Sequence, residues 1–384
     1  MEKNIKIIIG ANYGDEGKGL LTRHFAVETI QNQKKGIVIL HNGSAQHGHT
    51  VDYNPHFRHV YHHFGCGTGD GLPTYFAETF WIHPMEFVRE YVELAKSGIY
   101  PKVYYHPQSR VVTPFDMLID HATEAWIALQ HGEREFGSCG YGTWCAIESR
   151  NIHMVYTINE FKDYNYFNIM DTTWKECLTI LIQRGVDVEK LPEYRDYFIP
   201  NSWKRQNLIN NFKKDLDFFF AHATSIEFDG IYSFFDNLIF ETGQGLGLDI
   251  NVDNDWHTTS NTGLTNPVEM LKDKEDFNAE VCYVSRAYIT RHGIGPMENE
   301  ALKKEINDNM IDRTNVHNDF QGSLRYGYPE DREQKIRIEK DWNIIKADKR
   351  FNKTIAITHC NEFPDFDNTI ANYISYNPYS VLEN

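Results

Sequence analysis

Short apolar runs alternate with longer segments of mixed polarity along this chain. The runs are rich in Ile, Val and Leu and are bounded by glycine or polar residues, which is typical of buried strands. We expect strands at residues 6–9, 35–40, 103–105, 237–241, 281–284 and 354–358. Between them, apolar positions recur with helical spacing at residues 20–30, 85–97 and 115–131. Strands alternating with helices predict an α/β fold, with a large, mostly parallel central sheet flanked by helices.

The stretch from about residue 156 to residue 223 has a different composition. It is rich in Lys, Asp, Asn and aromatic residues and poor in glycine, which favours helices. We expect a helical subregion attached to the sheet, followed by a turn at residues 230–233. Because no low-complexity linker separates this stretch from the rest, residues 1–384 are expected to form a single domain.

The first predicted strand runs into a glycine-rich loop, residues 10–19, which opens into a helix. This arrangement points backbone N–H groups and a helix N-terminus at a phosphate. Lys18 adds a positive charge, whereas the carboxylates of Asp15 and Glu16 would repel a phosphate unless a cation lay between them, so the loop suggests a nucleotide with Mg²⁺. The layout is like that of P-loop NTPases, but Leu20 stands where a Walker A loop has Ser or Thr. The alternative is a glycine-rich turn with a surface lysine.

Further polar, glycine-containing loops follow the other strands, at residues 41–51, 137–143 and 242–250. In open α/β sheets ligands bind at the carboxyl ends of the strands, so these loops are expected to meet at one site. Seven histidines lie between His41 and His63. A zinc site is one interpretation, although no recognised ligand spacing is present; a strand with polar and aromatic faces at residues 59–64 is the other.

Charge and composition exclude several classes of protein. The chain has 54 acidic and 38 basic residues and a formal net charge of −16, which argues against a general nucleic-acid binder. It has no apolar run of about 18 residues, so we expect no membrane span. Six cysteines without Cys-x-x-Cys pairs and a start that leaves no room for a signal peptide predict a cytoplasmic protein.

Four segments, in order along the chain, carry a resemblance to a known family. They are residues 14–19 (Gly-Asp-Glu-Gly-Lys-Gly), 45–51, 240–261 (beginning Phe-Glu-Thr-Gly-Gln-Gly) and 287–296. Together they resemble the adenylosuccinate synthetases, ligases that join aspartate to inosine monophosphate (IMP) with GTP. The resemblance covers nearly the whole chain. It implies the adenylosuccinate synthetase fold, Mg²⁺, small-molecule partners (a purine nucleotide and an amino acid) and a homodimer.

The resemblance also implies catalytic roles. Asp15 would take the N1 proton of the purine, so that O6 attacks the γ-phosphate of a nucleoside triphosphate. His49 and Lys18 would stabilise the charge that develops on the phosphoryl group, and Gln244 would hold the 6-oxygen region. Asp15 and the carbonyl of Gly48 would bind the metal. Alternatives remain for two of these residues: His49 as an ordinary surface histidine, and Gln244 as a polar residue at a strand end.

Other residues are assigned to binding by the same resemblance. The nucleotide and its phosphates would contact Gly14, Glu16, Gly17, Gly19, Gly48, Thr50, His359 and Asn361. The substrates would contact Gln46, Ser138, Cys139, Arg150, Thr258, Thr259, Arg291 and Arg325.

Several departures from the family concern specificity. The family reads guanine with Thr-Lys-x-Asp, whereas residues 358–361 here are Thr-His-Cys-Asn. The amide of Asn361 offers one donor and one acceptor, which matches adenine better than guanine, so ATP is favoured over GTP. The alternative is that Asn361 caps a turn.

The loops that bind aspartate and the partner subunit's nucleotide are also altered. Residues 320–325 keep only Arg325 of the family's two arginines, and Ser323 stands at the place of the other, which weakens recognition of a dicarboxylate. In the third loop the family's arginine is absent and His153 occupies its place; Arg150 is a possible substitute.

Viral 2-aminoadenylosuccinate synthetases, which act on dGMP and can use ATP, also differ from the family in the motif that reads guanine. They typically replace the catalytic aspartate of the first loop, whereas this chain keeps Asp15, which favours IMP or dIMP as the substrate and leaves dGMP as the alternative. Two other functions fit the same scaffold: a nucleotide-binding sensor or regulatory subunit that has lost ligation, and a phosphohydrolase that cleaves the nucleoside triphosphate.

Overall fold

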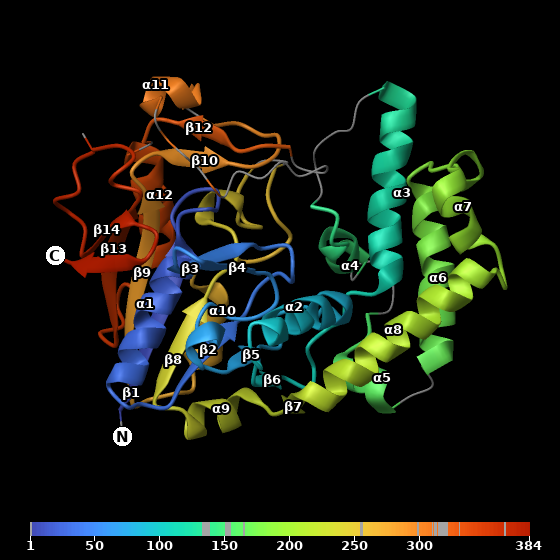
Figure 1. Cartoon of the computed structure of the whole chain (residues 1–384), viewed down its shortest axis with the longest axis horizontal. Helices are drawn as coiled ribbons and strands as arrows, with labels where there is room; N and C mark the ends of the chain where they lie inside the picture. Colours follow the sequence, from blue (N-terminus) through green and yellow to red (C-terminus); the bar gives the residue numbers. More distant parts are fainter. Residues whose placement is uncertain are drawn as a thin grey trace.

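A large twisted sheet forms the centre of the protein (Figure 1). The computed structural model describes residues 2–132, 139–149, 155–163, 166–253, 256–297, 299–308, 310, 313, 322–329, 331–364 and 366–384. Within these residues ten strands lie in the order β15-β14-β13-β9-β1-β8-β2-β5-β6-β7. Their bounds are β15 Ser380–Glu383, β14 Tyr373–Asn377, β13 Phe351–Thr358, β9 Phe277–Arg286, β1 Lys3–Gly10, β8 Asn237–Glu241, β2 Gly36–Leu40, β5 Thr74–Phe76, β6 Val103–Tyr105 and β7 Ala223–Ser225. Every pair is parallel except β14 with β15, which confirms the predicted sheet.

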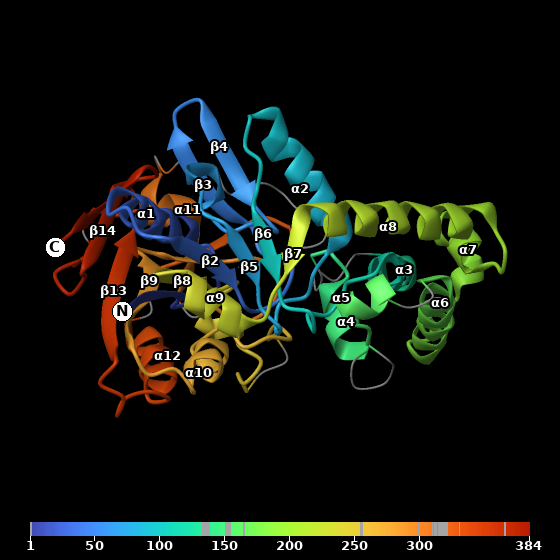
Figure 2. The same cartoon turned by 90° about the horizontal axis from the view of Figure 1, so that it is seen from below.

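Strand β1 lies inside the sheet and is buried on both faces. Ile8 packs with Leu21 and Phe25 of α1 (Lys18–Gln31), whereas Ile7 and Ile9 belong to a separate core cluster on the opposite face. Helices α10 (Thr265–Leu271) and α12 (Asp331–Trp342) cover that opposite face (Figure 2). A strand covered by helices on both sides needs apolar residues at successive positions, which explains the unbroken run that predicted it.

The predicted helices are present, and proline starts two of them. Helix α2 covers Pro84–Lys96 and α3 covers Pro114–His131. At α3 the side chains of Thr113 and Asp116 form a capping box, which satisfies backbone N–H groups at the helix start. The remaining helices are α4 Thr143–Ser149, α5 Ile158–Asp163, α6 Tyr166–Gln183, α7 Pro192–Phe198, α8 Trp203–His222, α9 Phe228–Phe234 and α11 Lys303–Asn307. No helix in the described chain is long and apolar enough to span a membrane.

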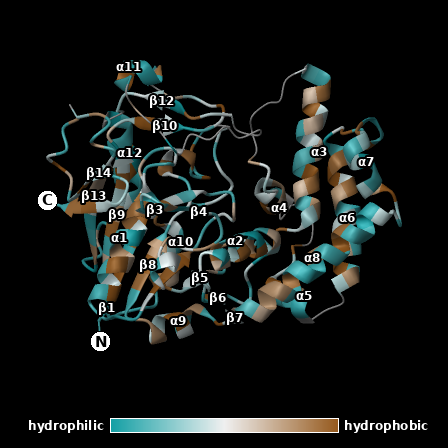
Figure 3. Cartoon of the chain, viewed as in Figure 1, coloured by the Kyte–Doolittle hydropathy of each residue, from teal (hydrophilic) through white to brown (hydrophobic). Residues whose placement is uncertain are grey.

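The helical subregion is confirmed between α5 and α8. Together with α3 these helices lie beside the β7 end of the sheet, and α8 leads directly into β7 (Figures 1 and 2). Helices α3 and α6 alternate hydrophobic and hydrophilic positions along their length (Figure 3), and their apolar side chains join the core cluster that also covers one face of the sheet.

Two local expectations need correction. Residues 230–233 lie in helix α9, because the backbone N–H groups of Gly230 and Ile231 bond to the carbonyl of Glu227. The strand expected at residues 59–64 is β4, Phe57–Tyr61, which pairs with β3 (His49–Asn54) in a separate hairpin. Short strands β10 (Ile289–Arg291), β11 (Glu300–Ala301) and β12 (Arg325–Gly327) form a third sheet.

Candidate functional site

The loops after β1, β2, β8 and β13 meet at the carboxyl edge of the sheet, as the sequence predicts. A cavity of about 580 Å³ opens there. Nine of the residues predicted from the sequence line it: Asp15, Gly17, Lys18, Gly19, Gly48, His49, Thr50, His359 and Asn361. The described residues that were predicted but lie outside its lining are Gly14, Glu16, Gln46, Cys139, Gln244, Thr258, Thr259, Arg291 and Arg325. Ser138 and Arg150, with His153, fall outside the described residues.

The first loop is drawn tightly against its neighbours. Gly17 adopts a left-handed backbone conformation immediately before α1, and a Cβ atom there would lie 3.0 Å from Cγ2 of Thr358. Glycine is therefore required both by the backbone angle and by the close approach of β13. The hydroxyl of Thr358 donates to the carbonyl of Glu16 at 2.7 Å, which ties the loop to the strand that carries Asn361.

Three site residues other than glycine also have left-handed backbones. The φ angles are 61° for Asp15, 58° for Gln244 and 58° for His359. Residues with a Cβ atom adopt this conformation at a cost of about 1–3 kcal/mol and do so mainly where function fixes them. These residues follow β1, β8 and β13, so the turns at three strand ends hold their side chains in place.

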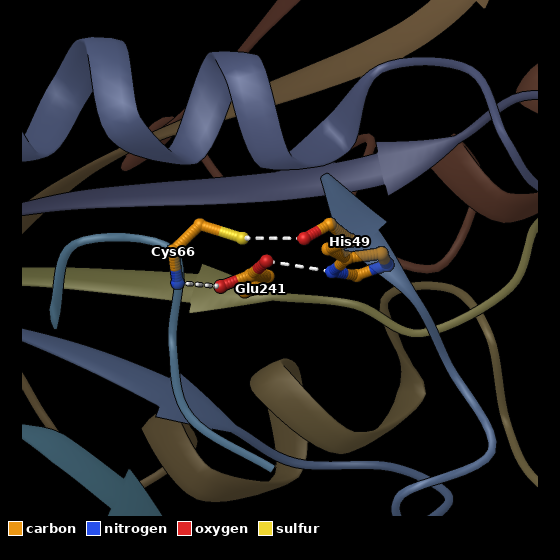
Figure 4. A group of neighbouring side chains, drawn as sticks. All are labelled: His49, Cys66 and Glu241. Atoms are coloured by element: carbon orange, nitrogen blue, oxygen red, sulfur yellow. Dashed lines mark hydrogen bonds and ion pairs between the residues drawn. The ribbon is translucent and has the colours of Figure 1, made fainter. Parts of the chain in front are cut away.

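His49 is buried and fixed from one side. Its Nδ1 lies 2.6 Å from Oε1 of Glu241, and Oε2 of Glu241 accepts a hydrogen bond of 2.9 Å from the backbone N–H of Cys66 (Figure 4). Burial, together with nearby Lys18, lowers the pKa of His49 well below its ordinary value. Burial raises the pKa of Glu241. His49 is therefore a neutral imidazole at neutral pH, with Nδ1 engaged.

Several buried polar atoms at this edge have no hydrogen-bond partner among the described residues. They are Nε2 of His49, both ring nitrogens of His47, Oε1 of Gln244 and Nδ1 of His292. An unsatisfied buried polar group costs about 1–3 kcal/mol, so such atoms indicate contacts with a ligand or water. His47 packs on His49 with ring centroids 4.8 Å apart, and Nε2 of His292 lies 3.7 Å from Oδ2 of Asp15.

His47 and His292 were not predicted as site residues, although a signal was present. The motifs that these loops resemble are Asn-Ala-Gly-His-Thr at residues 46–50 and Ala-Tyr-x-Thr-Arg-Val-Gly-x-Gly-Pro at residues 287–296. Each histidine therefore stands in a matched loop as a polar replacement, His47 for Ala and His292 for Val. Three arginines that line the cavity were also missed: Arg58, Arg286 and Arg313. Arg58 of β4 and Arg286 at the end of β9 both line the cavity and add positive charge to it. The side chain of Arg286 donates to the carbonyl of Asp15.

The oxygen donors in the cavity fit Mg²⁺. The Asp15 side chain is about one quarter exposed and lines the same cavity as Gly48. Mg²⁺ is typically held by one or two carboxylates together with substrate phosphates, which these residues could provide. Among the described residues, no three of the seven histidines in the second loop and the β3–β4 hairpin come together as metal ligands. His59 pairs with Glu90, and His62 bonds to the carbonyl of His47.

Two of the residues expected to contact the substrates, Arg291 and Arg325, hold a loop in this structure. In Arg325, Nε donates to Glu300 at 2.8 Å, and NH1 donates to the carbonyl of Gly295 at 2.8 Å. Arg291 is 2% exposed and donates from NH1 to the carbonyl of Pro296 at 2.7 Å. Both guanidinium groups therefore brace residues 293–296 in this structure.

Three further predicted residues make local contacts. The side chain of Gln46 accepts a hydrogen bond of 2.6 Å from the N–H of Ser44, and the N–H of Thr258 donates to the carbonyl of Leu248 at 2.7 Å. Cys139 lies in the loop before α4, where neighbouring Gly142 is anchored on Asp120 of α3.

Comparisons with known proteins agree with this arrangement. A family model described as adenylosuccinate synthetase matches residues 7–322. The chain is 24% identical over 314 residues to adenylosuccinate synthetase from Thermosipho africanus, which covers 78% of this chain and 67% of that protein. It is 23% identical over 318 residues to the enzyme from Mesoplasma florum, covering 81% of this chain and 68% of that protein.

Two solved structures share the fold. One is the fully ligated adenylosuccinate synthetase from Plasmodium falciparum, with a TM-score of 0.66 and 19% identity, covering 94% of this chain and 77% of that chain. The other is the succinoaminodeoxyadenylate synthetase of cyanophage S-2L, bound to dGMP and to dATP as an energy donor. Its TM-score is 0.63 at 13% identity, and the match covers 100% of this chain and 96% of that chain.

Proposed function

This chain belongs to the adenylosuccinate synthetase family of carbon–nitrogen ligases that use a purine nucleotide, and we propose that it joins an amino acid, aspartate in the first instance, to a 6-oxopurine nucleotide with a nucleoside triphosphate and Mg²⁺. One observation carries the proposal. Asp15, Lys18, Gly48 and His49, from two different loops, line a single cavity at the carboxyl edge of the sheet. A base, a cation, a metal-binding carbonyl and a hydrogen-bond donor are the groups that phosphorylation of a purine oxygen needs.

The reaction has two steps. Asp15 takes the N1 proton of the purine, and the electron pair on O6 attacks the γ-phosphorus, which releases the nucleoside diphosphate. The amino group of the amino acid then attacks C6, and inorganic phosphate leaves with the former O6. Gln244 holds the 6-oxygen region, and His49 donates through Nε2 to the oxygen on which charge develops. Asp15 and the carbonyl of Gly48 would hold Mg²⁺, which would supply positive charge beside the transferred group.

ATP is the proposed phosphoryl donor. Asn361 lines the cavity at the end of β13, on the same loop as His359. Its amide can accept from the 6-amino group of adenine and donate to N1, whereas guanine presents two neighbouring donors to it. Asn377, the last residue of β14, and Tyr379, in the turn before β15, also line the cavity.

IMP or dIMP is the proposed purine substrate, because Asp15 is retained in the first loop. A second candidate is dGMP. It is supported by the cyanophage enzyme, whose structure was solved with dGMP and dATP. The match between the two folds covers nearly the full length of both chains. We also propose a cytoplasmic homodimer with a single domain, which rests on the family alone.

One assay tests the function. The purified chain is incubated with Mg²⁺, with ATP, dATP or GTP, with IMP, dIMP, GMP or dGMP, and with aspartate or a panel of other amino acids. Mass spectrometry follows the nucleotide products. We expect a purine–amino-acid adduct whose formation is abolished in Asp15→Ala.

Other outcomes would contradict the ligase. Release of phosphate without an adduct would favour the phosphohydrolase, and nucleotide binding without turnover would favour the sensor. An adduct that forms with a neutral amino acid but not with aspartate would overturn the choice of aspartate. That outcome has a structural reason, because Glu300 and two backbone carbonyls already engage Arg325.

A further inference from the structure

One group of side chains near the cavity has the composition of a metal site. His49, Cys66 and Glu241 each offer a ligand-type atom, all of these atoms lie within 4.8 Å of one another, and all three residues are buried. In the described part of the chain this is the one such group of three or more residues. Imidazole, thiolate and carboxylate together would suit Zn²⁺.

The hydrogen bonds inside the group argue against a metal. Glu241 uses one oxygen for Nδ1 of His49 and the other for the N–H of Cys66 (Figure 4). The thiol of Cys66 points to the backbone carbonyl of His49, with 3.8 Å between sulfur and oxygen. Because the carboxyl oxygens and Nδ1 already bind partners, a metal would have to break the contacts that hold the group together.

We infer that Glu241 is the positioning residue for His49: its buried carboxyl group is protonated and donates from Oε1 to Nδ1, so the proton of the neutral ring lies on Nε2, which faces the reacting atoms. The inference rests on the proposed function, because that function makes His49 a hydrogen-bond donor in the reaction. Nε2 is buried and has no partner among the described residues, which is expected of a donor whose acceptor arrives with the substrate.

The surroundings leave the ring little freedom. His49 begins β3, Glu241 ends β8, and Cys66 lies in the loop before β5. Helix α1 also packs against the group at Gly19. The packing is so close that a Cβ atom on Gly19 would lie 3.1 Å from Sγ of Cys66 and 3.3 Å from the carbonyl carbon of His49. The group is therefore enclosed by separate elements of the fold, and its geometry does not depend on one flexible loop.

Hydrogen-bond complementarity makes the inference testable with one isosteric change. In Glu241→Gln, the amide oxygen must accept from the N–H of Cys66, because the NH₂ group would face another donor there. The NH₂ group then points to Nδ1 and donates to it, which leaves the ring proton on Nε2. Glutamine thus reproduces the proposed arrangement, and alanine removes it.

The kinetic test compares these variants in the ligase assay. We expect Glu241→Ala to lower kcat by about 10- to 100-fold, with little change in KM for the nucleoside triphosphate, and Glu241→Gln to recover most of that loss. Glu93→Ala is the control, because Glu93 also pairs with a histidine, His59, but is about two-thirds exposed. A kcat in Glu241→Gln as low as in Glu241→Ala would overturn the inference. So would an unchanged kcat in Glu241→Ala.

A second measurement does not depend on turnover. With ¹⁵N-labelled histidine, the ring signals of His49 are assigned by their loss in His49→Asn. We expect a protonated Nε2 and an unprotonated Nδ1 in the unsubstituted chain and in Glu241→Gln, and a mixture of both tautomers in Glu241→Ala. A protonated Nδ1 with an unprotonated Nε2 in the unsubstituted chain would overturn the inference, whether or not the chain proves to be a ligase.

Discussion

The ammonium group of Lys18 lies 2.8 Å from Oε2 of Glu16, and neither side chain exposes more than 2% of its surface. The other carboxylate oxygen accepts hydrogen bonds from the backbone N–H groups of Asn12 and Gly14, at 3.1 and 2.8 Å. Glu16 therefore organises the first loop from within and neutralises Lys18. An incoming phosphate competes with Glu16 for the lysine instead of meeting a free charge.

The first prediction concerns this pair. Glu16→Ala leaves a buried ammonium group and two loop N–H groups without their acceptor, so it should lower the free energy of unfolding by about 3–5 kcal/mol. Urea denaturation measures the change. Asp217→Ala, which removes the exposed partner of Lys213, is the control and should cost less than about 1 kcal/mol. Equal losses in the two variants would contradict the internal role of Glu16.

A second prediction concerns His292, whose Nε2 lies 3.7 Å from Oδ2 of Asp15. We expect this imidazole to donate to the carboxylate in the substrate complex and so to orient the proposed base. His292→Val should lower kcat of the ligase reaction about tenfold, which corresponds to about 1.4 kcal/mol. The fold should survive, since valine is the residue of the resembled motif. His56→Val, in an exposed turn, is the control, and an unchanged kcat in His292→Val would remove His292 from the mechanism.

The third prediction concerns the choice of nucleotide. A carboxylate at position 361 can accept from both N1–H and the 2-amino group of guanine, so Asn361→Asp should shift preference from ATP toward GTP. The ratio of kcat/KM values should change by about 1–3 kcal/mol, or roughly 5- to 150-fold. Asn377→Asp adds the same charge elsewhere on the cavity wall. If both variants changed the ratio equally, charge and not base reading would be the cause.

The fourth prediction concerns pH. His83 is fully buried, and burial lowers its pKa to about 4, whereas in the unfolded chain it titrates near 6.5. Its contribution to stability is thus complete above pH 6.5 and is lost as pH falls toward 4, at about 1.4 kcal/mol per pH unit.

Urea denaturation at a series of pH values tests this contribution. His83→Gln should show a shallower decline than the unsubstituted chain between pH 6.5 and pH 4. Because other buried histidines such as His41 add their own decline, the difference between the two curves is the relevant quantity. Parallel curves would show that His83 does not stay neutral in the folded state.

The sequence was sufficient for the sheet and for the loops at its edge. Strands buried on both faces, such as β1, leave an unbroken apolar run, and parallel strands place their carboxyl ends together whatever the details of the connections. For this reason the sequence alone could assign Asp15, His49 and Asn361 to one edge of the sheet, although Asp15 and Asn361 lie more than 300 residues apart.

Pairing between side chains could not be predicted in the same way. Glu241 ends a buried strand, and nothing in its neighbours shows that it would meet His49, which lies 192 residues earlier. Similarly, the sequence predicted only a dicarboxylate substrate as the partner of Arg325. Its contact with Glu300 could not be predicted, because the small sheet that brings the two residues together leaves no clear pattern in the sequence. Residue type indicates what a side chain can bind, but rotamers and strand pairing decide which partner it finds.

The place of β1 in the sheet has a consequence for synthesis on the ribosome. Strand β1 is synthesised well before its partners β8 and β9, which begin at Asn237 and Phe277. Pairings so distant in sequence form late and slowly. The glycine-rich loop that follows β1 therefore emerges before β8 and β9 but gains its final shape only after they are made. Until then its apolar strand needs protection from aggregation, so this chain should depend on chaperones during translation more than its size alone would indicate.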